Sequence, residues 1–301
     1  MKYKAFCEFC DSEKIKYSKN EPMRLHTSFK IGGEADLFVN VGTVEELKKV
    51  ILKSNELSIP FFVIGKGSNL LVSDKGIEGV VINLSLLDKI TAEDNTLTAF
   101  SGASLASVCT AALENSLSGL EFAYGIPGSV GGALYMNAGA YGGEMSQVVK
   151  SATYVTADGE IGEISIEDMA LGYRTSAFKT NNAIITSVTF ELEKGDSSEI
   201  KSKMLDFTNR RVQKQPLEYP SAGSTFKRPE GYFAGALIEG NGLKGRSVGG
   251  AQVSVKHAGF VINTGDATCC QVKELIKIIQ DTVRENNGVE LETEVIYIGK
   301  E

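Results

Sequence analysis

The chain has 301 residues, of which 42% are hydrophobic and 23% charged, a composition typical of a globular protein with a core large enough for two or three domains. A net charge of −7 argues against a general nucleic-acid or membrane-surface binder, and no apolar run is long enough to predict a membrane span. The first residues contain no apolar signal core, and the odd count of five cysteines excludes a complete set of internal disulfides. We therefore expect a cytoplasmic protein that binds neither nucleic acid nor membrane.

The first part of the chain alternates predicted strands and helices. Residues 1–24 are polar and charged and favour either a short helix or a loose leader. A helix is expected to begin at Thr43, because Thr43 and Glu46 have the spacing of a capping box. Apolar patterns predict a turn and strand at 29–41, strands at 61–64, 79–84 and 97–100, and helices at 43–55 and 104–116. This β–α–β rhythm is typical of an α/β subdomain.

The second part begins with predicted strands and ends with a long helix and a strand. Asp158-Gly159 has the composition of a hairpin turn between two of these strands. Pro216 and Pro220 mark a break after a charged amphipathic helix. The expected strands are 148–156, 161–166, 184–192 and 291–298, and the expected helices are 197–211 and 272–286.

Two glycine-rich stretches are the most informative motifs. Gly65-Lys66-Gly67-Ser68-Asn69 follows a predicted strand, and residues 125–132 and 136–144 form a longer glycine-rich region. Dense glycine leaves backbone N–H groups uncovered, so that they can approach an anionic group. The first stretch matches neither the usual dinucleotide fingerprint nor the P-loop pattern. The first stretch alone is as consistent with a plain turn, but the pair indicates a cradle for the diphosphate of a dinucleotide cofactor.

Cys7 and Cys10 form a C-x-x-C pair that could suggest zinc. A zinc site needs two further ligands, and the later cysteines and the two histidines do not have paired metal spacing. We therefore expect no metal site, and interpret the pair as incidental.

At these motifs the sequence resembles the UDP-N-acetylenolpyruvoylglucosamine reductase (MurB) family. The resemblance is carried by residues 25–33, 65–74, 125–132 and 136–142, and it extends from Asn20 to Gly299. It implies an α+β fold with α/β subdomains: an FAD-binding domain of the PCMH/vanillyl-alcohol-oxidase type and a MurB C-terminal substrate domain. The implied organisation is a leader at 1–24, an FAD-binding domain at 25–193 with subdomains at about 25–85 and 86–193, and a substrate domain at 194–301 whose last strand returns to the active site.

The resemblance also implies three catalytic residues, each within a matching motif. Arg174 lies in Tyr173-Arg174-Thr175-Ser176-Ala177-Phe178-Lys179, and its guanidinium would hold the substrate carboxylate. Ser224 lies in the motif at 220–229 and would protonate the substrate carbon as general acid. Glu294 lies in the closing strand. Strand periodicity places Glu292 and Glu294 on one face and cannot choose between them, so the family pattern alone selects Glu294.

The remaining implied contacts fall into two groups. Non-covalent FAD would be bound by Gly65, Lys66, Gly67, Ser68, Asn69, Leu70, Gly125, Ile126, Pro127, Gly128, Ser129, Gly131, Gly132, Asn137 and Gly139. Substrate would be bound by Tyr141, Lys214, Lys227, Arg228, Gln252, Lys256 and His257. Lys66 departs from the glycine of many family members, which removes any need for a left-handed backbone there. The short interval between Arg174 and Ser224 predicts that the tyrosine-bearing loop inserted in some members is absent.

The activity implied is reduction of UDP-N-acetylglucosamine enolpyruvate to UDP-N-acetylmuramate for peptidoglycan synthesis. NADPH would reduce FAD, hydride would pass to the vinyl carbon, and Ser224 would supply the proton while Arg174 and Glu294 stabilise the enolate. A monomer is expected. Two alternatives remain: an FAD-dependent oxidase of an alcohol or sugar on the same scaffold, and a non-catalytic nucleotide-sugar binding protein. Only His26 and His257 could tether flavin as histidines, and neither lies in a suitable loop.

Overall fold

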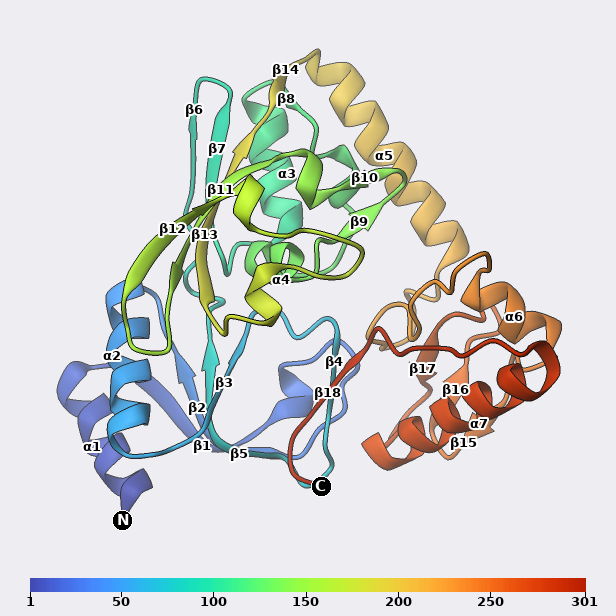
Figure 1. Cartoon of the computed structure of the whole chain (residues 1–301), viewed down its shortest axis with the longest axis horizontal. Helices are drawn as coiled ribbons and strands as arrows, with labels where there is room; N and C mark the ends of the chain where they lie inside the picture. The colour runs from blue at the N-terminus through green and yellow to red at the C-terminus, as the bar shows by residue number, and fades with distance from the viewer. The chain divides into compact units, whose positions relative to one another are not determined.

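The computed structural model describes all of residues 1–301 (Figure 1). Residue contacts divide the chain into two compact units. Unit 1 contains Met1–Lys19, Leu37–Lys66 and Gly79–Arg210, and unit 2 contains Asn20–Asp36, Gly67–Glu78 and Arg211–Glu301. The chain therefore crosses between the units several times. The domain limits expected from sequence stay a prediction.

The first core of unit 1 lies between helices and a sheet of order β1-β2-β5-β3. Its elements are α1 (Lys2–Glu13), β1 (Lys16–Pro22), β2 (Glu34–Asn40), α2 (Val44–Glu56), β3 (Phe61–Ile64) and β5 (Ile77–Asn83). Figure 1 shows α1 and α2 beside these strands, and β3 runs parallel to β5. Phe6, Cys7 and Cys10 of α1 are buried in this core, so residues 1–24 contribute a packed helix and a strand. Burial raises the pKa of the Cys10 thiol to about 12, which favours an inert, protonated group.

The start of α2 shows how local sequence sets an element boundary. Thr43 Oγ1 accepts the Glu46 N–H at 3.1 Å, as its predicted cap role requires. The Glu46 carboxylate does not complete the box; it accepts the Gly42 N–H at 2.8 Å, one residue before the cap. Thr43 is therefore confirmed as the N-cap, with Glu46 supporting the preceding turn.

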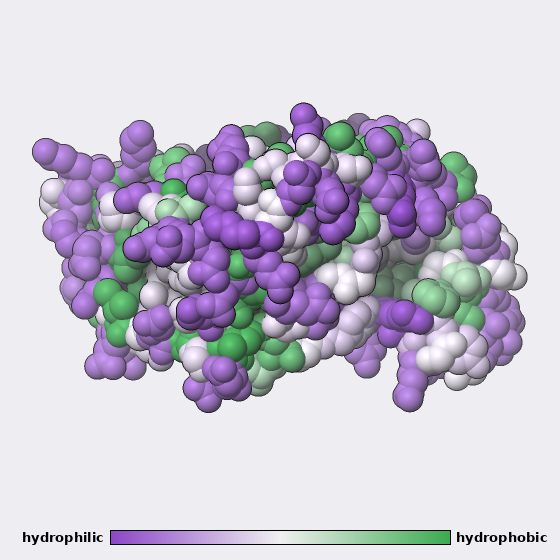
Figure 2. Space-filling model, turned by 90° about the horizontal axis from the view of Figure 1, so that it is seen from above, coloured by the Kyte–Doolittle hydropathy of each residue, from purple (hydrophilic) through white to green (hydrophobic).

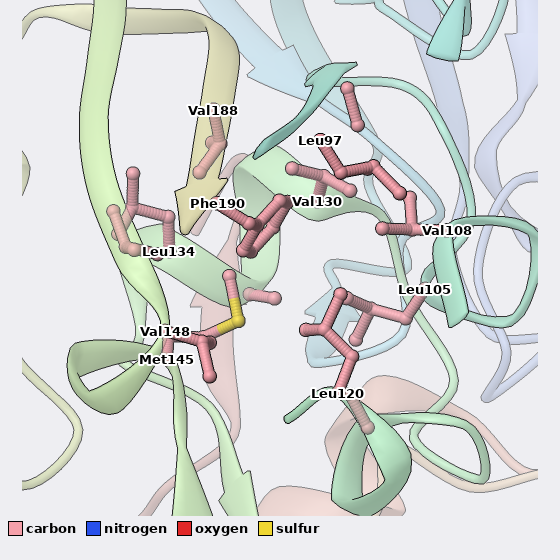
Figure 3. Packing of buried hydrophobic residues seen from close by; sticks show 14 of the residues in the cluster. Leu97, Leu105, Val108, Leu120, Val130, Leu134, Met145, Val148, Val188 and Phe190 are labelled. Atoms are coloured by element: carbon pink, nitrogen blue, oxygen red, sulfur yellow. The ribbon is translucent and has the colours of Figure 1, made fainter. Parts of the chain in front are cut away.

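The second core of unit 1 is built on a five-stranded antiparallel sheet of order β12-β11-β13-β7-β6. The elements are β6 (Ile90–Glu93), β7 (Thr96–Phe100), α3 (Leu105–Glu114), α4 (Val130–Tyr135), β11 (Val149–Val155), β12 (Ile161–Ser165) and β13 (Ile184–Glu191). Figure 3 shows Val130 and Leu134 of α4 among the apolar side chains that include Phe190 of β13. The short helix α4, which lies within the second glycine-rich region, is thus anchored in an apolar core.

Unit 2 has its own core between α7 (Cys269–Asn287), α6 (Ala234–Gly240) and the antiparallel sheet β15-β16-β17. Those strands are Ser247–Val248, Ala251–Val253 and Val261–Asn263. Thr268 and Gln271 form a capping box at the start of α7, and Gly288 ends the helix in a left-handed conformation. The Asp74 carboxylate accepts the N–H groups of Cys269 and Cys270 at 2.7 and 3.0 Å, so the segment after β4 (Leu70–Val72) is fixed to this helix.

The last predicted strand is shorter than expected. Only Ile296–Ile298 forms β18, which runs parallel to β4. The preceding residues do not continue this strand, and Thr293 instead forms an antiparallel bridge with Phe226. The predicted strand at 291–298 is therefore wrong in its first half, because two different partners divide the apolar run.

Short elements complete the chain: β8 (Leu117–Ser118) with β14 (Glu193–Lys194), β9 (Gly139–Ala140) with β10 (Gly143–Glu144), helix α5 (Ser197–Lys214), and the 3-10 turns Met23–Leu25, Glu121–Ala123, Met145–Gln147, Ile166–Asp168 and Ala177–Lys179. Figure 2 shows a face where hydrophilic side chains predominate and hydrophobic ones lie between them. None of the helices combines the length and apolar character that a membrane crossing needs.

Candidate active site

The two glycine-rich stretches touch within unit 1. A Cβ on Gly65 would lie 2.1 Å from Ser129 Oγ and 3.0 Å from Ser129 Cβ, so only glycine allows this approach. Ser129 is the N-cap of α4, with its hydroxyl toward the Gly132 N–H. The predicted meeting of the two loops is therefore found at this pair.

The second stretch is fixed by backbone pairing with the end of β7. The Val130 and Gly131 N–H groups donate to the carbonyls of Ala103 and Ser101, each at 2.9 Å. A Cβ on Gly131 would lie 2.7 Å from Ser101 Cβ, so no side chain fits between the two segments. The backbone of residues 128–131 is thus held rigidly before any ligand binds.

The first stretch passes from unit 1 to unit 2 between Lys66 and Gly67. Gly67 has φ +61°, and a Cβ there would lie 2.1 Å from the His26 carbonyl oxygen. Asn69 Nδ2 donates to the Glu294 carbonyl at 3.0 Å, while the Asn69 carbonyl accepts the Ile296 N–H at 2.9 Å. Asn69 therefore fixes the backbone of a predicted catalytic residue.

Asn137 has a comparable place in unit 1. It is 1% exposed, its Nδ2 donates to the Gly172 carbonyl at 3.1 Å, and its Oδ1 accepts the Ser146 N–H at 2.9 Å. Its sequence-predicted role was cofactor binding, which stays a prediction, as do the other predicted cofactor contacts. Leu70, another predicted contact, is buried in β4.

Arg174 sits at the tip of a tight turn. Gly172 and Thr175 exchange backbone hydrogen bonds of 3.2 Å in each direction, and Arg174 has φ 55°. Lys179 Nζ donates to the Arg174 carbonyl at 2.6 Å, and Ser176 Oγ donates to the Tyr135 carbonyl of α4 at 2.8 Å. The guanidinium carbon lies 5.1 Å from the centre of the Tyr173 ring. The turn presents a half-exposed arginine and is tied through Ser176 to the last residue of α4.

Ser224 and Glu294 are brought together in unit 2 by antiparallel pairing of segments far apart in sequence. The Glu294 N–H donates to the Thr225 carbonyl and the Lys227 N–H donates to the Glu292 carbonyl, both at 2.9 Å. Buried Thr225 is held further, because its N–H donates to the Gly259 carbonyl and its Oγ1 accepts the Val261 N–H. Ser224 is therefore next in sequence to the residue that pairs with Glu294.

The two glutamates left open by strand periodicity differ in the structure. Glu292 is exposed and pairs with Lys227 at 2.8 Å, and this lysine lowers the pKa of the Glu292 carboxyl. Glu294 is half-buried and backbone-bound on both sides. The geometry thus separates a glutamate in a surface ion pair from a half-buried glutamate whose backbone is fixed.

The predicted substrate-binding cations do not form one free cluster. Lys227 is paired with Glu292, and Lys256 donates to the Val212 carbonyl at 2.8 Å and lies 3.6 Å from Glu218. The Arg228 guanidinium lies 4.1 Å from the centre of the Phe233 ring. Lys214 is exposed at the end of α5.

The uncharged candidates are also engaged. Tyr141 stacks on Phe207 of α5 with ring centres 4.7 Å apart and planes at 1°. Gln252 Nε2 donates to Ser247 Oγ at 2.9 Å. His257 Nδ1 accepts the Gly259 N–H at 3.1 Å, and burial, the largest cause, lowers the pKa of this histidine.

Ser101 is a residue that sequence reasoning did not select. Its hydroxyl is buried without a hydrogen-bond partner, although it lies beside Gly131. The sequence signal that could have drawn attention to Ser101 is its position, because it directly follows a strand, as Gly65 does. All five cysteines are free thiols, and no group of three His, Cys, Asp or Glu residues could hold a metal.

Comparison with known proteins finds similarity over the whole length. Residues 35–165 match the family model described as an FAD binding domain, and residues 215–298 match the C-terminal domain of UDP-N-acetylenolpyruvoylglucosamine reductase. The reductase of that name from Clostridium novyi is 52% identical over 291 residues, covering 97% of this chain and 94% of that protein. The one from Clostridium perfringens strain SM101 is 52% identical over 299 residues, covering 99% and 98%.

A solved structure agrees with these sequence matches. The crystal structure of UDP-N-acetylenolpyruvylglucosamine reductase from Thermus caldophilus superimposes with a TM-score of 0.80 at 34% identity. The match covers 94% of this chain and 98% of that one. Sequence and fold thus point to the same relatives across both units.

Proposed function

The chain belongs to the UDP-N-acetylenolpyruvoylglucosamine reductase family, and from that premise we propose that it reduces UDP-N-acetylglucosamine enolpyruvate to UDP-N-acetylmuramate through Arg174, Ser224 and Glu294. It is an FAD-dependent oxidoreductase of peptidoglycan precursor synthesis, with a nicotinamide nucleotide as the source of electrons. NADPH is the nucleotide we propose. The MurB family identified from sequence is confirmed, as is the α+β fold with an FAD-binding domain.

The residues of the glycine-rich stretches fit such a cofactor. Gly65 allows the close approach of Ser129 where the two stretches meet, and Gly131 allows that of Ser101. A backbone with so few side chains can approach the oxygens of a diphosphate. When bound, FAD supplies the hydride that the enolpyruvyl group receives.

The observation that carries the proposal is the pairing of the Ser224 and Glu294 segments. The 2.9 Å bond from the Glu294 N–H to the Thr225 carbonyl joins the segment that carries the Ser224 hydroxyl to the one that carries the Glu294 carboxylate, which supports a shared role. A serine hydroxyl is a weak acid, so it needs a strongly basic acceptor. The carbon next to the substrate carboxylate becomes such an acceptor once the vinyl carbon is reduced.

Arg174 would bind the negatively charged carboxylate of the substrate. Its turn offers a guanidinium that can hold a carboxylate through two parallel hydrogen bonds. Charge that develops on the substrate carboxylate in the transition state would be stabilised by this fork, and Glu294 is the second residue that we propose to stabilise the enolate. The basic residues Lys214, Lys227, Arg228 and Lys256, with Tyr141, Gln252 and His257, remain proposed contacts of the nucleotide sugar.

The alternatives are less well supported. Neither an oxidase nor a non-catalytic binding protein is favoured, because the matches to the reductases extend over both units. A monomeric state and a cytoplasmic location remain proposals from the sequence.

The test is Ser224→Ala in the FAD-loaded protein under anaerobic conditions. NADPH should still bleach the flavin absorbance at the wild-type rate, because that half-reaction needs no proton from Ser224. Reoxidation by the enolpyruvyl nucleotide sugar should slow by about a hundredfold or more. Stopped-flow absorbance separates the two half-reactions.

Ser221→Ala is the matched control. It lies three residues earlier in the same segment, and its backbone carbonyl accepts a hydrogen bond from Ser28 Oγ at 2.7 Å. It should leave both half-reactions unchanged. If the flavin of Ser224→Ala were reoxidised at the wild-type rate, Ser224 would have no part in the mechanism.

A further inference from the structure

Arg174 occupies a backbone position that arginine rarely takes. Gly172 and Thr175 close a four-residue turn by exchanging backbone hydrogen bonds of 3.2 Å, and Arg174 is the third residue of this turn, with φ 55°. A turn with a positive φ at its third position usually has glycine or asparagine there, because other side chains are strained in that conformation. Contacts around the turn must therefore offset the strain at Arg174.

Lys179 donates to the carbonyl of the strained residue itself. Its Nζ lies 2.6 Å from the Arg174 carbonyl oxygen, and a hydrogen bond from a charged donor is stronger than one between neutral groups. The lysine is half-buried, and its Nζ also lies 5.6 Å from the centre of the Tyr135 ring at the end of α4. The ammonium group therefore contacts both the turn and the helix of the second glycine-rich region.

The backbone that carries Lys179 is fixed by packing in unit 1. Lys179 ends a 3-10 turn that begins at Ala177, whose N–H donates to the Met169 carbonyl at 2.7 Å. Its neighbour Phe178 is 2% exposed and packs edge-to-face on Tyr154 of β11, with ring centres 6.3 Å apart. The lysine thus extends from a well-packed segment to a strained turn, as a side chain that holds the turn in place must do.

We propose that Lys179 is a positioning residue, which holds the left-handed backbone of Arg174 and so sets the direction of its guanidinium. A change of this φ would turn the Cα–Cβ bond, and a displacement of about 1 Å at a catalytic group can lower the rate about a hundredfold. The inference rests on the carboxylate-binding role of Arg174 in the proposed function. It adds a lysine that is not among the predicted substrate contacts.

The competing explanation is that the Lys179 ammonium group binds an anionic ligand directly. The two explanations differ in what the lysine does once the Arg174 guanidinium is removed. A lysine that acts through Arg174 then has no further effect on the rate, whereas a lysine that contacts the ligand has the same effect in either protein. A double-mutant cycle with Lys179→Met and Arg174→Ala separates them, because methionine has a similar length but no charge and no donor.

The rate to measure is reoxidation of the NADPH-reduced flavin by the enolpyruvyl nucleotide sugar, followed by stopped-flow absorbance. We expect Lys179→Met to slow this step by about tenfold and to leave flavin reduction by NADPH at the wild-type rate. Arg174→Ala should slow reoxidation by about a hundredfold, and the double variant should be no slower than Arg174→Ala alone. Lys179→Arg keeps a charged donor and should recover part of the lost rate.

Lys194→Met is the matched control. Lys194 is an exposed lysine of unit 1, and its Nζ donates to the Asp94 carbonyl at 2.8 Å. The variant removes the same type of contact from another part of the unit, so both half-reactions should keep their wild-type rates.

The proposal is overturned if Lys179→Met is reoxidised at the wild-type rate, if both of its half-reactions slow equally, or if it slows the Arg174→Ala protein by a further tenfold. Wild-type reoxidation of Arg174→Ala is a different result, because it removes Arg174 from the proposed function itself.

Discussion

Two asparagines, one from each glycine-rich region, hold the backbone at or near a proposed catalytic residue through different contacts. Asn137 binds the carbonyl of Gly172, two residues before Arg174, and Asn69 binds the carbonyl of Glu294 itself. Asn69 joins a proposed cofactor loop to the backbone of a proposed catalytic residue, and Asn137 joins one to the turn that carries Arg174. Asn137 does so in unit 1 and Asn69 in unit 2.

The two sites differ in what else holds the catalytic backbone. The Glu294 N–H donates to the Thr225 carbonyl, and the Ile296 N–H donates to the Asn69 carbonyl. Neither bond uses the Asn69 side chain, so backbone pairing alone still supports Glu294. The Arg174 turn is a four-residue loop, and the buried Asn137 amide links it to Ser146 as well. The comparison teaches that a catalytic residue on a turn depends on side-chain braces more than one on paired strands does.

The sharpest way to break the comparison is Asn137→Asp. The aspartate keeps the acceptor for the Ser146 N–H and the size of the side chain, but it loses the donor to Gly172 and brings a charge toward that carbonyl. We expect the free energy of unfolding to fall by about 3 kcal/mol, because a buried polar contact is lost and replaced by a repulsion. We expect kcat to fall by about tenfold as the Arg174 turn loosens.

Chemical denaturation and steady-state kinetics measure both effects. Asn182→Asp is the matched control, because Asn182 also has a left-handed backbone, with φ 55° against 42° for Asn137, and it is exposed. It should be close to wild type in both measurements. A stable, fully active Asn137→Asp would show that the turn holds Arg174 by itself.

Asn69→Ala is the smaller counterpart. It removes one partly exposed hydrogen bond of 3.0 Å, and the backbone pairing of Glu294 stays. We expect the free energy of unfolding to fall by about 1 kcal/mol. We expect kcat to fall by about threefold, with a smaller change in the FAD dissociation constant.

Gln280→Ala separates stability from function in the same segment. Gln280 Nε2 donates to the Leu291 carbonyl at 2.8 Å, three residues before Glu294. Gln280→Ala should lower the free energy of unfolding by about as much as Asn69→Ala does, without lowering kcat. Equal effects of Asn69→Ala and Asn137→Asp on both quantities would remove the distinction between turn and paired strands.

Much of this arrangement was readable from sequence because its signals are local. The Thr43 cap, the glycine-rich stretches, the Asp158-Gly159 turn and the long helices depend on residues a few positions apart. The roles of Arg174, Ser224 and Glu294 came from family resemblance, since strand periodicity left Glu292 and Glu294 equivalent. The structure separates these two by the Lys227 ion pair.

The remaining features could not be predicted from the sequence, because they depend on pairing between residues far apart in the chain. Asn69 and Glu294 are 225 positions apart, and no local pattern announces their bond. The run at 291–298 looks like one strand, yet Thr293 pairs with Phe226 and Ile296 pairs with Leu70. Ser101 likewise became visible only when its hydroxyl proved to be buried without a partner.

The smallest expected effect is a difference between the two units in how stability depends on pH. Both histidines lie in unit 2, so mild acid titrates no histidine of the unit that carries Arg174. Burial lowers the pKa of His257, and the charges of Lys244 and Lys214 lower it further, whereas a backbone hydrogen bond and Glu239 oppose this change. In the unfolded chain the same group has a pKa of about 6.5. Below that pH the unfolded chain therefore binds more protons than the folded one, and stability falls as the pH falls.

Protonation also removes the Nδ1 acceptor of the Gly259 N–H, and the Gly259 carbonyl holds the N–H of Thr225 beside Ser224. His257→Asn offers an amide oxygen that does not titrate, so its unfolding free energy should decline less between pH 7 and 5 than that of wild type. His26, paired with Glu21 at 2.8 Å, is present in both proteins and cancels in the difference. Denaturant titrations at several pH values measure the two slopes. Identical slopes would mean that acid reaches the Ser224 segment through other groups, and the pH contrast between the two units would then have no basis in His257.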